Sequence, residues 1–259
     1  MINYIKSELY RILHSKGAYI FIGICSALLI AANIVLAVCK LAEPSFPYAT
    51  TVFSTGTVMS SMTFVYILCI TVAALVFGNE HTNHTMKNTV SYGITRGTLY
   101  FGKLIVQIIY AIVAFTIIIG AHLASAYLLL ENSPVNEIIG LLRLSLVCLP
   151  LLLFALAATN CFYFIIEGTG LANTLIIGLL MGLPIASSFL GMKFKLFRDL
   201  NIVLPWNLIN KIGIEGASLK IVLPWEGNTG YYNYWIYGMV QFLLITIIGY
   251  VVFRKKEIK

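Results

Sequence analysis

Residues 96–104, RGTLYFGKL, contain most of a pattern by which many proteins bind the phosphates of a nucleotide. Gly97, Gly102 and Lys103 match G-x-x-x-x-G-K-[ST], in which backbone N–H groups surround phosphate oxygens and the final hydroxyl binds Mg²⁺. Leu104 occupies the position of that hydroxyl and cannot bind a metal ion. The preceding residues are polar rather than strand-forming, and an apolar run follows at once. We therefore expect this chain to bind no nucleotide and no other cofactor.

A second group of possible ligands lies upstream, where Glu80, His81 and His84 are close together in the sequence. Two histidines three positions apart lie near one face of a helix and could contribute to a zinc site. No Cys or further His lies nearby to complete the ligand set. The sequence therefore predicts a polar helix surface here and no metal site.

The composition is that of a protein embedded in a bilayer. Of 259 residues, 59% are hydrophobic and 10% are charged, whereas soluble domains carry about 25% charged residues. Six apolar runs are long enough to cross a hydrocarbon core of about 30 Å as helices. They cover residues 18–39, 58–78, 104–130, 144–166, 171–191 and 235–253. We predict an all-α polytopic membrane protein that forms a single transmembrane domain.

The distribution of Lys and Arg predicts that both termini are cytoplasmic. With six spans and inner termini, ten basic residues lie inside and seven outside, and the sequence RKK at 254–256 follows the last span. The net charge of +7 is explained by the basic residues that set the orientation of the spans. No basic tract interleaved with aromatic residues indicates nucleic-acid binding.

Two segments outside the spans have distinctive patterns. Residues 1–16 place apolar side chains on one helical face, which is typical of an amphipathic helix lying in the inner interface. Residues 192–234 contain the pentapeptide IVLPW twice, at 202–206 and 221–225, with several further aromatic residues. We expect this segment to form an outer re-entrant cap between the fifth and sixth spans. An ordinary surface loop with interfacial tryptophans is the alternative.

The polar segment between the second and third spans predicts a short helix at 80–92 on the cytoplasmic surface. Asn79 can cap this helix, and Glu80 would then lie in its first turn. Gly93 suits the end of the helix, and Thr95 can cap the following span. Lys103 is expected to extend back toward the lipid headgroups. Such a helix is suited to a groove on a cytoplasmic partner.

Polar residues inside the apolar runs offer two interpretations. Each costs free energy in lipid, so each is expected to face protein. They either form hydrogen bonds between helices or line a route for cargo. Gly178 and Gly182 have the spacing that permits close approach of helices, within one chain or between two. The polar residues in question are Asn33, Gln107, His122, Asn160, Asn173 and Gln241.

The segment 80–103 resembles a stretch found in permeases of ATP-binding cassette (ABC) exporters of the type-2 class. The class pattern is E…G-T-x-K-N-T-x-S-x-G-x-[ST]-R…K, and it is met here by Glu80, by residues 85–89, by residues 91–96 and by Lys103. His84 departs from it, because Gly is usual at that position. The chain is most similar to the compact bacterial six-span group that includes bacitracin-resistance, lantibiotic-immunity and peptide-toxin export permeases.

This resemblance implies a permease that depends on a separate ABC ATPase subunit, in two copies, which would hold ATP and Mg²⁺. A second permease copy, identical or related, would complete the transporter in a bacterial plasma membrane. The segment 80–92 would be the coupling helix that contacts the ATPase. The residues expected to couple to the ATPase are Glu80, Thr85, Lys87, Asn88, Ser91 and Arg96.

The resemblance also places the first and fifth spans at the seam between two permease copies. Asn33 and Asn173 are therefore the expected residues of a substrate route, and Gly178 and Gly182 the expected residues of the dimer seam. The expected cargo is an amphipathic or antimicrobial peptide, or another hydrophobic compound, moved outward.

Two other classes remain as alternatives. A self-sufficient secondary transporter would carry ionisable groups deep in the spans and repeated halves. Only Glu167 is an acidic candidate near a span, and the halves show no obvious repeat. An intramembrane enzyme would need paired acids or a His–Glu cluster at membrane depth, whereas His122 stands alone.

Overall fold

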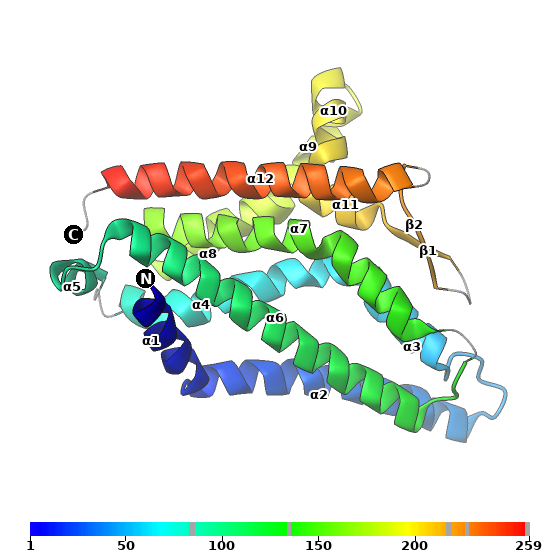
Figure 1. Cartoon of the computed structure of the whole chain (residues 1–259). Coiled ribbons are helices and arrows are strands. Elements are labelled where there is room, and N and C mark those ends of the chain that lie inside the picture. Colours follow the sequence, from blue (N-terminus) through cyan, green and yellow to red (C-terminus); the bar gives the residue numbers. More distant parts are fainter. Residues whose placement is uncertain (83–85, 134–135, 216–218, 226–227, 257–259) are drawn as a thin grey trace.

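The computed structural model describes residues 1–82, 86–133, 136–215, 219–225 and 228–256. Long helices form an elongated bundle (Figure 1). The first half contains α1 (Ile2–Leu13), α2 (Lys16–Ala42), α3 (Thr51–Ser60), the 3₁₀ turn η1 (Met62–Phe64), α4 (Val65–Thr82), α5 (Met86–Ser91) and α6 (Arg96–Leu129). The second half contains α7 (Glu137–Ile165), α8 (Thr169–Ile177), the π-helical turn η2 (Gly178–Gly182), α9 (Leu183–Gly191), α10 (Lys195–Val203), α11 (Pro205–Asn210), β1 (Gly213–Glu215), β2 (Lys220–Val222) and α12 (Asn228–Lys255).

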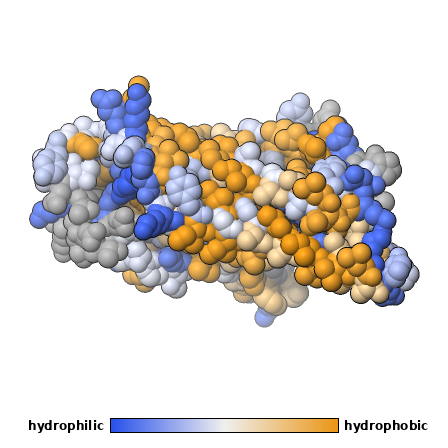
Figure 2. Space-filling model, turned by 90° about the horizontal axis from the view of Figure 1, so that it is seen from below, coloured by the Kyte–Doolittle hydropathy of each residue, from blue (hydrophilic) through white to orange (hydrophobic). Residues whose placement is uncertain are grey.

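The described residues contain five helices that could cross a membrane, or six when one bent pair is counted as a span. The five are Lys16–Ala42, Arg96–Leu129, Glu137–Ile165, Thr169–Gly191 and Gly230–Lys255. On the face seen in Figure 2, apolar side chains cover the middle of the molecule and polar side chains gather toward its two ends. The prediction of an all-α polytopic membrane protein is confirmed at this level, with the short β1–β2 hairpin as an addition.

The second candidate span differs from the predicted run 58–78, because its helix begins earlier and is broken. Thr51–Ser60 and Met62–Gly78 meet at an angle of 49°. Thr57 donates a hydrogen bond to the carbonyl of Phe53, and Ser60 donates one to the carbonyl of Gly56. Hydroxyls that bond to the carbonyl four residues earlier bend helices, which gives a physical reason for the break.

α7 and α12 pack closely against each other through glycines that lie outside the predicted Gly178–Gly182 pair. A Cβ atom on Gly238 would lie 2.7 Å from Pro150 Cβ, and one on Gly249 would lie 2.8 Å from Cys161 Sγ. Small residues allow the backbones of two membrane helices to approach closely. The glycines of α12 therefore set its distance from α7.

The two IVLPW copies in the segment 192–234 adopt different structures. In the first copy, Pro205 begins α11, whereas the second copy contains the end of β2. Trp206 stacks on Tyr66 of α4 with ring centroids 5.8 Å apart. Tyr234 of α12 donates a hydrogen bond to the carbonyl of Leu208, which is fully buried. The part of the segment around α11 is therefore packed on the bundle, and whether it enters a membrane stays a prediction.

The N-terminus and the end of α12 lie at the same end of the bundle, together with α1 and α5 (Figure 1). The β1–β2 hairpin and α3 lie toward the opposite end. We call the end that contains α1 and α5 the terminal end. Six crossings, with the bent pair counted as one span, would bring α1 and the end of α12 to the same side of a membrane.

Candidate functional site

Four charged side chains from three helices meet at the terminal end. Glu8 and Arg11 come from α1, Glu80 from α4 and Lys103 from α6. Lys103 Nζ lies 2.7 Å from Glu80 Oε1 and 3.2 Å from Glu8 Oε2. Arg11 contacts the same two carboxylates, at 2.6 Å from Glu8 and 3.1 Å from Glu80. We refer to these residues as the four-charge cluster.

The four-charge cluster is balanced in charge, and three of its four members are buried, whereas the Arg11 side chain is 32% exposed. Lys103 is fully buried, and Glu8 and Glu80 are each 7% exposed. The carbonyl of Val76 accepts hydrogen bonds from both Arg11 and Lys103, and Lys103 Nζ lies 4.9 Å from the centre of the Phe77 ring. Buried charges are tolerated only when they are paired and hydrogen-bonded. The cluster therefore holds α1, α4 and α6 together.

Two expectations about these residues are wrong. Glu80 does not lie in the first turn of a separate helix 80–92, because α4 continues through it to Thr82 and its carboxylate is buried. Lys103 does not extend toward headgroups, because its ammonium is buried against Glu80 and Glu8. Each of the two residues is paired with an opposite charge inside the protein, through Oε1 in the case of Glu80. The sequence signal that pointed toward this cluster was the presence of several charges on elements predicted to lie at the same membrane face.

The phosphate-loop pattern lies inside a continuous helix. α6 begins at Arg96, and Thr95 caps it by accepting a hydrogen bond from Thr98 N, as predicted. Gly97 is thus a helical residue. A Cβ on Gly102 would lie 2.6 Å from Tyr4 Cδ1, so Gly102 provides the space in which α1 crosses α6. From Leu99 onward, the N–H groups of this stretch bond within the helix and are not available to phosphate.

α5 is the described part of the predicted coupling helix. Gly93 follows it with φ 85°, a left-handed conformation that suits the end of a helix. Lys87 is exposed, and Ser91 donates a hydrogen bond to the carbonyl of Lys87. Thr85 lies outside the described residues, and Asn88 belongs to α5 although its side chain is not described. The structure thus separates Glu80, on α4, from the residues of α5.

Arg96 binds the end of α12 instead of projecting from the surface. Its Nη1 donates to the carbonyls of Phe253, Arg254 and Lys256 at 3.1, 2.7 and 2.6 Å. The last carbonyls of a helix lack partners within the helix and carry partial negative charge. Arg96 therefore satisfies these carbonyls and connects the beginning of α6 to the end of α12.

Comparison with known protein families gives a match to the description ABC-2 family transporter protein over residues 4–186. This match covers more than half of the chain. The chain belongs to the ABC-2 transporter family. No curated protein and no solved structure matches the chain significantly.

Membership in this family confirms the prediction of an ABC-2 type permease. ABC-2 membrane proteins work in a membrane and imply an ATPase partner. The family match also favours a transport subunit over the two alternative classes. It covers all four residues of the four-charge cluster and α5.

Replacing Arg96 with glutamine in this ABC-2 protein is expected to loosen the end of α12. Loss of the carbonyl contacts removes about 1 kcal/mol of local stabilisation. Hydrogen–deuterium exchange of the peptide covering residues 245–256 should accelerate severalfold. Arg254→Gln is the matched control, because Arg254 is exposed. Equal exchange in both variants would contradict the capping role of Arg96.

The two residues expected along a substrate route lie in separate hydrogen-bond groups. Asn33 is fully buried and donates to the carbonyl of His122 at 3.2 Å and to Ser125 Oγ at 2.7 Å. Asn173 Oδ1 accepts a 2.8 Å hydrogen bond from Tyr163. Both side chains therefore connect helices, and their role in transport stays a prediction. Gln107 likewise bonds to Asn160 at 2.8 Å.

Gly178 and Gly182 are open within this chain. Among the described residues, no atom lies within 4 Å of a Cβ built on either glycine, backbone of their own helix aside. The pair therefore makes no close helix contact inside the described chain. A seam with a second copy stays a prediction.

Proposed function

We propose that this chain is the membrane-spanning subunit of an ATP-driven exporter and that α5 is its contact with a separate ATPase. The observation that carries the proposal is the four-charge cluster next to α5. α5 follows α4, which contributes Glu80, and precedes α6, which contributes Lys103. A displacement of α5 therefore acts on two helices that share a buried ion pair.

The cluster links three helices, so that a displacement of α5 acts on all of them. Glu8 and Arg11 connect α1 to the Glu80–Lys103 pair, so α1, α4 and α6 move as one unit when α5 is displaced. Interfaces between packed helices switch between discrete arrangements and do not deform continuously. Closure of two ATPase copies around ATP and Mg²⁺ would then shift the bundle between states open to opposite sides.

The remaining parts of the proposal concern partners, orientation and cargo. Two permease copies, identical or related, would meet along a seam containing Gly178 and Gly182, whose surroundings in this chain are open. The terminal end would face the bacterial cytoplasm, which is supported by the basic residues near it. The cargo would be an amphipathic or antimicrobial peptide or another hydrophobic compound, as in the bacitracin-resistance and lantibiotic-immunity permeases.

The test is reconstitution of the full chain with a candidate ATPase in proteoliposomes. The purified chain alone should hydrolyse no ATP, and the co-purified complex should hydrolyse it. Lys87→Glu combined with Ser91→Glu on α5 should abolish co-purification and lower hydrolysis at least tenfold. Lys255→Glu at the exposed end of α12 is the matched control and should leave both unchanged.

Two results would contradict the proposal. Hydrolysis by the chain alone would place a nucleotide site on it. A complex that ignores the α5 substitutions would place the ATPase contact elsewhere. A self-sufficient secondary transporter or an intramembrane enzyme would act without any ATPase, so the same preparation separates these classes.

A further inference from the structure

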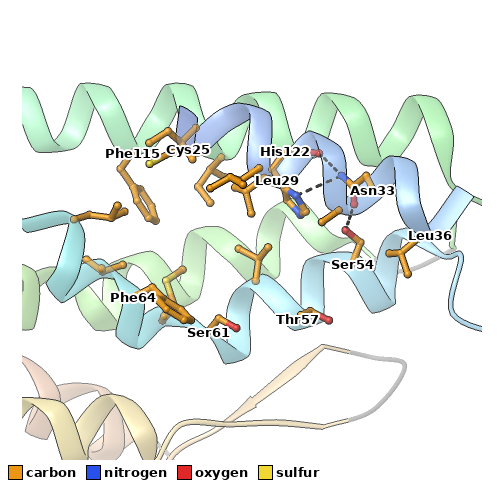
Figure 3. Close-up of a pocket in the computed structure, with 18 of the residues that line it drawn as sticks. Cys25, Leu29, Asn33, Leu36, Ser54, Thr57, Ser61, Phe64, Phe115 and His122 are labelled. Atoms are coloured by element: carbon orange, nitrogen blue, oxygen red, sulfur yellow. Dashed lines mark hydrogen bonds between the residues drawn. The ribbon is translucent and has the colours of Figure 1, made fainter. Parts of the chain in front are cut away.

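A cavity of ≈ 600 Å³ lies between α2, the bent pair α3–α4, and α6. Its lining side chains project toward one another from these helices (Figure 3). Small-molecule sites in proteins have volumes of about 300–1,000 Å³, so this cavity is large enough for a ligand. It is distinct from the four-charge cluster, none of whose residues lines it.

The walls of the cavity are almost entirely apolar. Leu29 and Cys25 line it from α2, Phe64 from η1, and Phe115 and Ile118 from α6. These residues belong to candidate membrane spans or to the bent pair, so the cavity lies within the part of the protein expected to cross the membrane. An apolar cavity of this kind does not hold water well and accepts hydrocarbon.

One part of the lining is polar and contains a donor without an acceptor. Ser54 Oγ donates to Asn33 Oδ1, and Asn33 Nδ2 lies 3.4 Å from His122 Nδ1 (Figure 3). A proton on Nδ1 would face the amide nitrogen, which is itself a donor, so the neutral imidazole that fits this arrangement carries its proton on Nε2. His122 is 1% exposed, and its Nε2 has no hydrogen-bond partner in the described part of the chain.

We propose that this cavity binds an amphiphile from the membrane, with its hydrocarbon chain between α2 and α3–α4 and a carbonyl or hydroxyl oxygen accepting a hydrogen bond from His122 Nε2. A buried donor without an acceptor costs free energy, and a ligand oxygen at this end of the cavity removes that cost. The Asn33 amide already makes its own hydrogen bonds, so His122 is the residue that recognises the oxygen.

The same chemistry could come from a phospholipid of the bilayer or from a single-chain amphiphile that the protein exports. Both combine an apolar chain with an ester or amide carbonyl. The proposal does not rest on ATPase coupling, because binding to the cavity requires only the purified chain. If no ligand binds in the cavity, the proposed function is unaffected. If no ATPase contact is found, the proposed binding site is unaffected.

The test is photolabelling of the full chain with a diazirine-bearing monoacylglycerol, followed by peptide mapping. Labelling should concentrate in residues 25–36 of α2 and 115–122 of α6. Ala32→Phe places a ring in the cavity and should reduce this labelling at least fivefold. Ala31→Phe is the matched control, because Ala31 is also exposed on α2 but does not line the cavity. His122→Phe removes the donor and should weaken the apparent affinity by about 3–10-fold.

Competition identifies the source of the ligand. Competition by dioleoylphosphatidylglycerol assigns a bilayer lipid, and competition by N-dodecanoylglycine methyl ester alone assigns an exported amphiphile. Either result supports the proposal. Labelling that is equal in the Ala32→Phe and Ala31→Phe variants would overturn it. Affinity that is unchanged in a folded His122→Phe variant would overturn the assigned hydrogen bond.

Discussion

Replacing Lys103 with methionine is expected to destabilise the folded chain by about 3–5 kcal/mol. The substitution keeps an apolar side chain of similar length on α6 but leaves Glu8 and Glu80 with only Arg11 as a basic partner. Removing one partner of a buried ion pair leaves a buried charge without compensation, and this charge is the main cost. Thermal unfolding and the yield of monodisperse protein in nanodiscs measure the effect.

A second substitution separates loss of the charge partner from loss of packing. Lys103→Met combined with Glu80→Gln removes one positive and one negative charge, so the cluster is balanced again. Exchanging both partners of a buried pair for neutral groups is often tolerated, and we expect the double variant to recover most of the lost stability. Lys87→Met on exposed α5 is the control and should change stability by less than about 0.5 kcal/mol. A Lys103→Met variant as stable as the Lys87→Met control would contradict the account of the cluster.

Replacing Gly249 with leucine is expected to cost roughly 3 kcal/mol, at the upper end of the range for overpacking. Even the first added carbon would overlap the Tyr100 hydroxyl of α6, its nearest neighbour, and would lie 2.8 Å from Cys161 Sγ of α7. Leucine would therefore force α12 away from both helices. The displacement would also disturb Arg96 at the end of α12. Thermal unfolding in nanodiscs is the measurement.

Two other glycines serve as controls for this prediction. Gly120 of α6 has no atom within 4 Å of a built Cβ among the described residues, its own helix backbone aside, so Gly120→Leu should be tolerated. Gly178→Leu should likewise leave the fold stable. If Gly178 lies in a seam between two permease copies, the same variant should dissociate the complex on size-exclusion chromatography. Equal destabilisation by all three substitutions would show that α7 and α12 have no special contact at Gly249.

Hydropathy and motif spacing were sufficient to predict the membrane class and the family. Long apolar runs have one stable solution in lipid, because every backbone polar group must be satisfied inside the segment. The stretch from Glu80 to Lys103 pointed to ABC-2 permeases, and the match over residues 4–186 confirms the family. The capping role of Thr95 and the end of α5 at Gly93 were also predictable, because local backbone chemistry determines them.

The charged contacts were not predictable from local sequence, because they depend on how distant helices pack. Glu80 and Lys103 are 23 residues apart, and Glu8 is 95 residues from Lys103. Their positions next to apolar runs were equally compatible with headgroup contacts. Only the packing of α1 across Gly102 brings all four charges together. Arg96 was assigned to the ATPase contact for the same reason, since nothing nearby in sequence indicates the end of α12.

The two pentapeptides show a second limit of local reasoning. Identical residues IVLPW lead into helix α11 in one copy and form part of β2 in the other. Their surroundings decide, because Trp206 stacks on Tyr66 whereas Trp225 contacts Tyr234. Local propensity is similar in both copies, so tertiary contacts select the structure.

Site-specific photocrosslinking in cells tests most directly the claim that an ATPase contacts the chain at α5. Benzoylphenylalanine would replace one of two exposed tyrosines. Tyr92 follows α5 and is 87% exposed, whereas Tyr232 lies near the beginning of α12 and is 67% exposed. We predict an adduct between position 92 and a subunit that carries a complete phosphate-binding loop, and none from position 232. An exporter that remains active in cells without any adduct from position 92, or with the same adduct from position 232, would contradict the account.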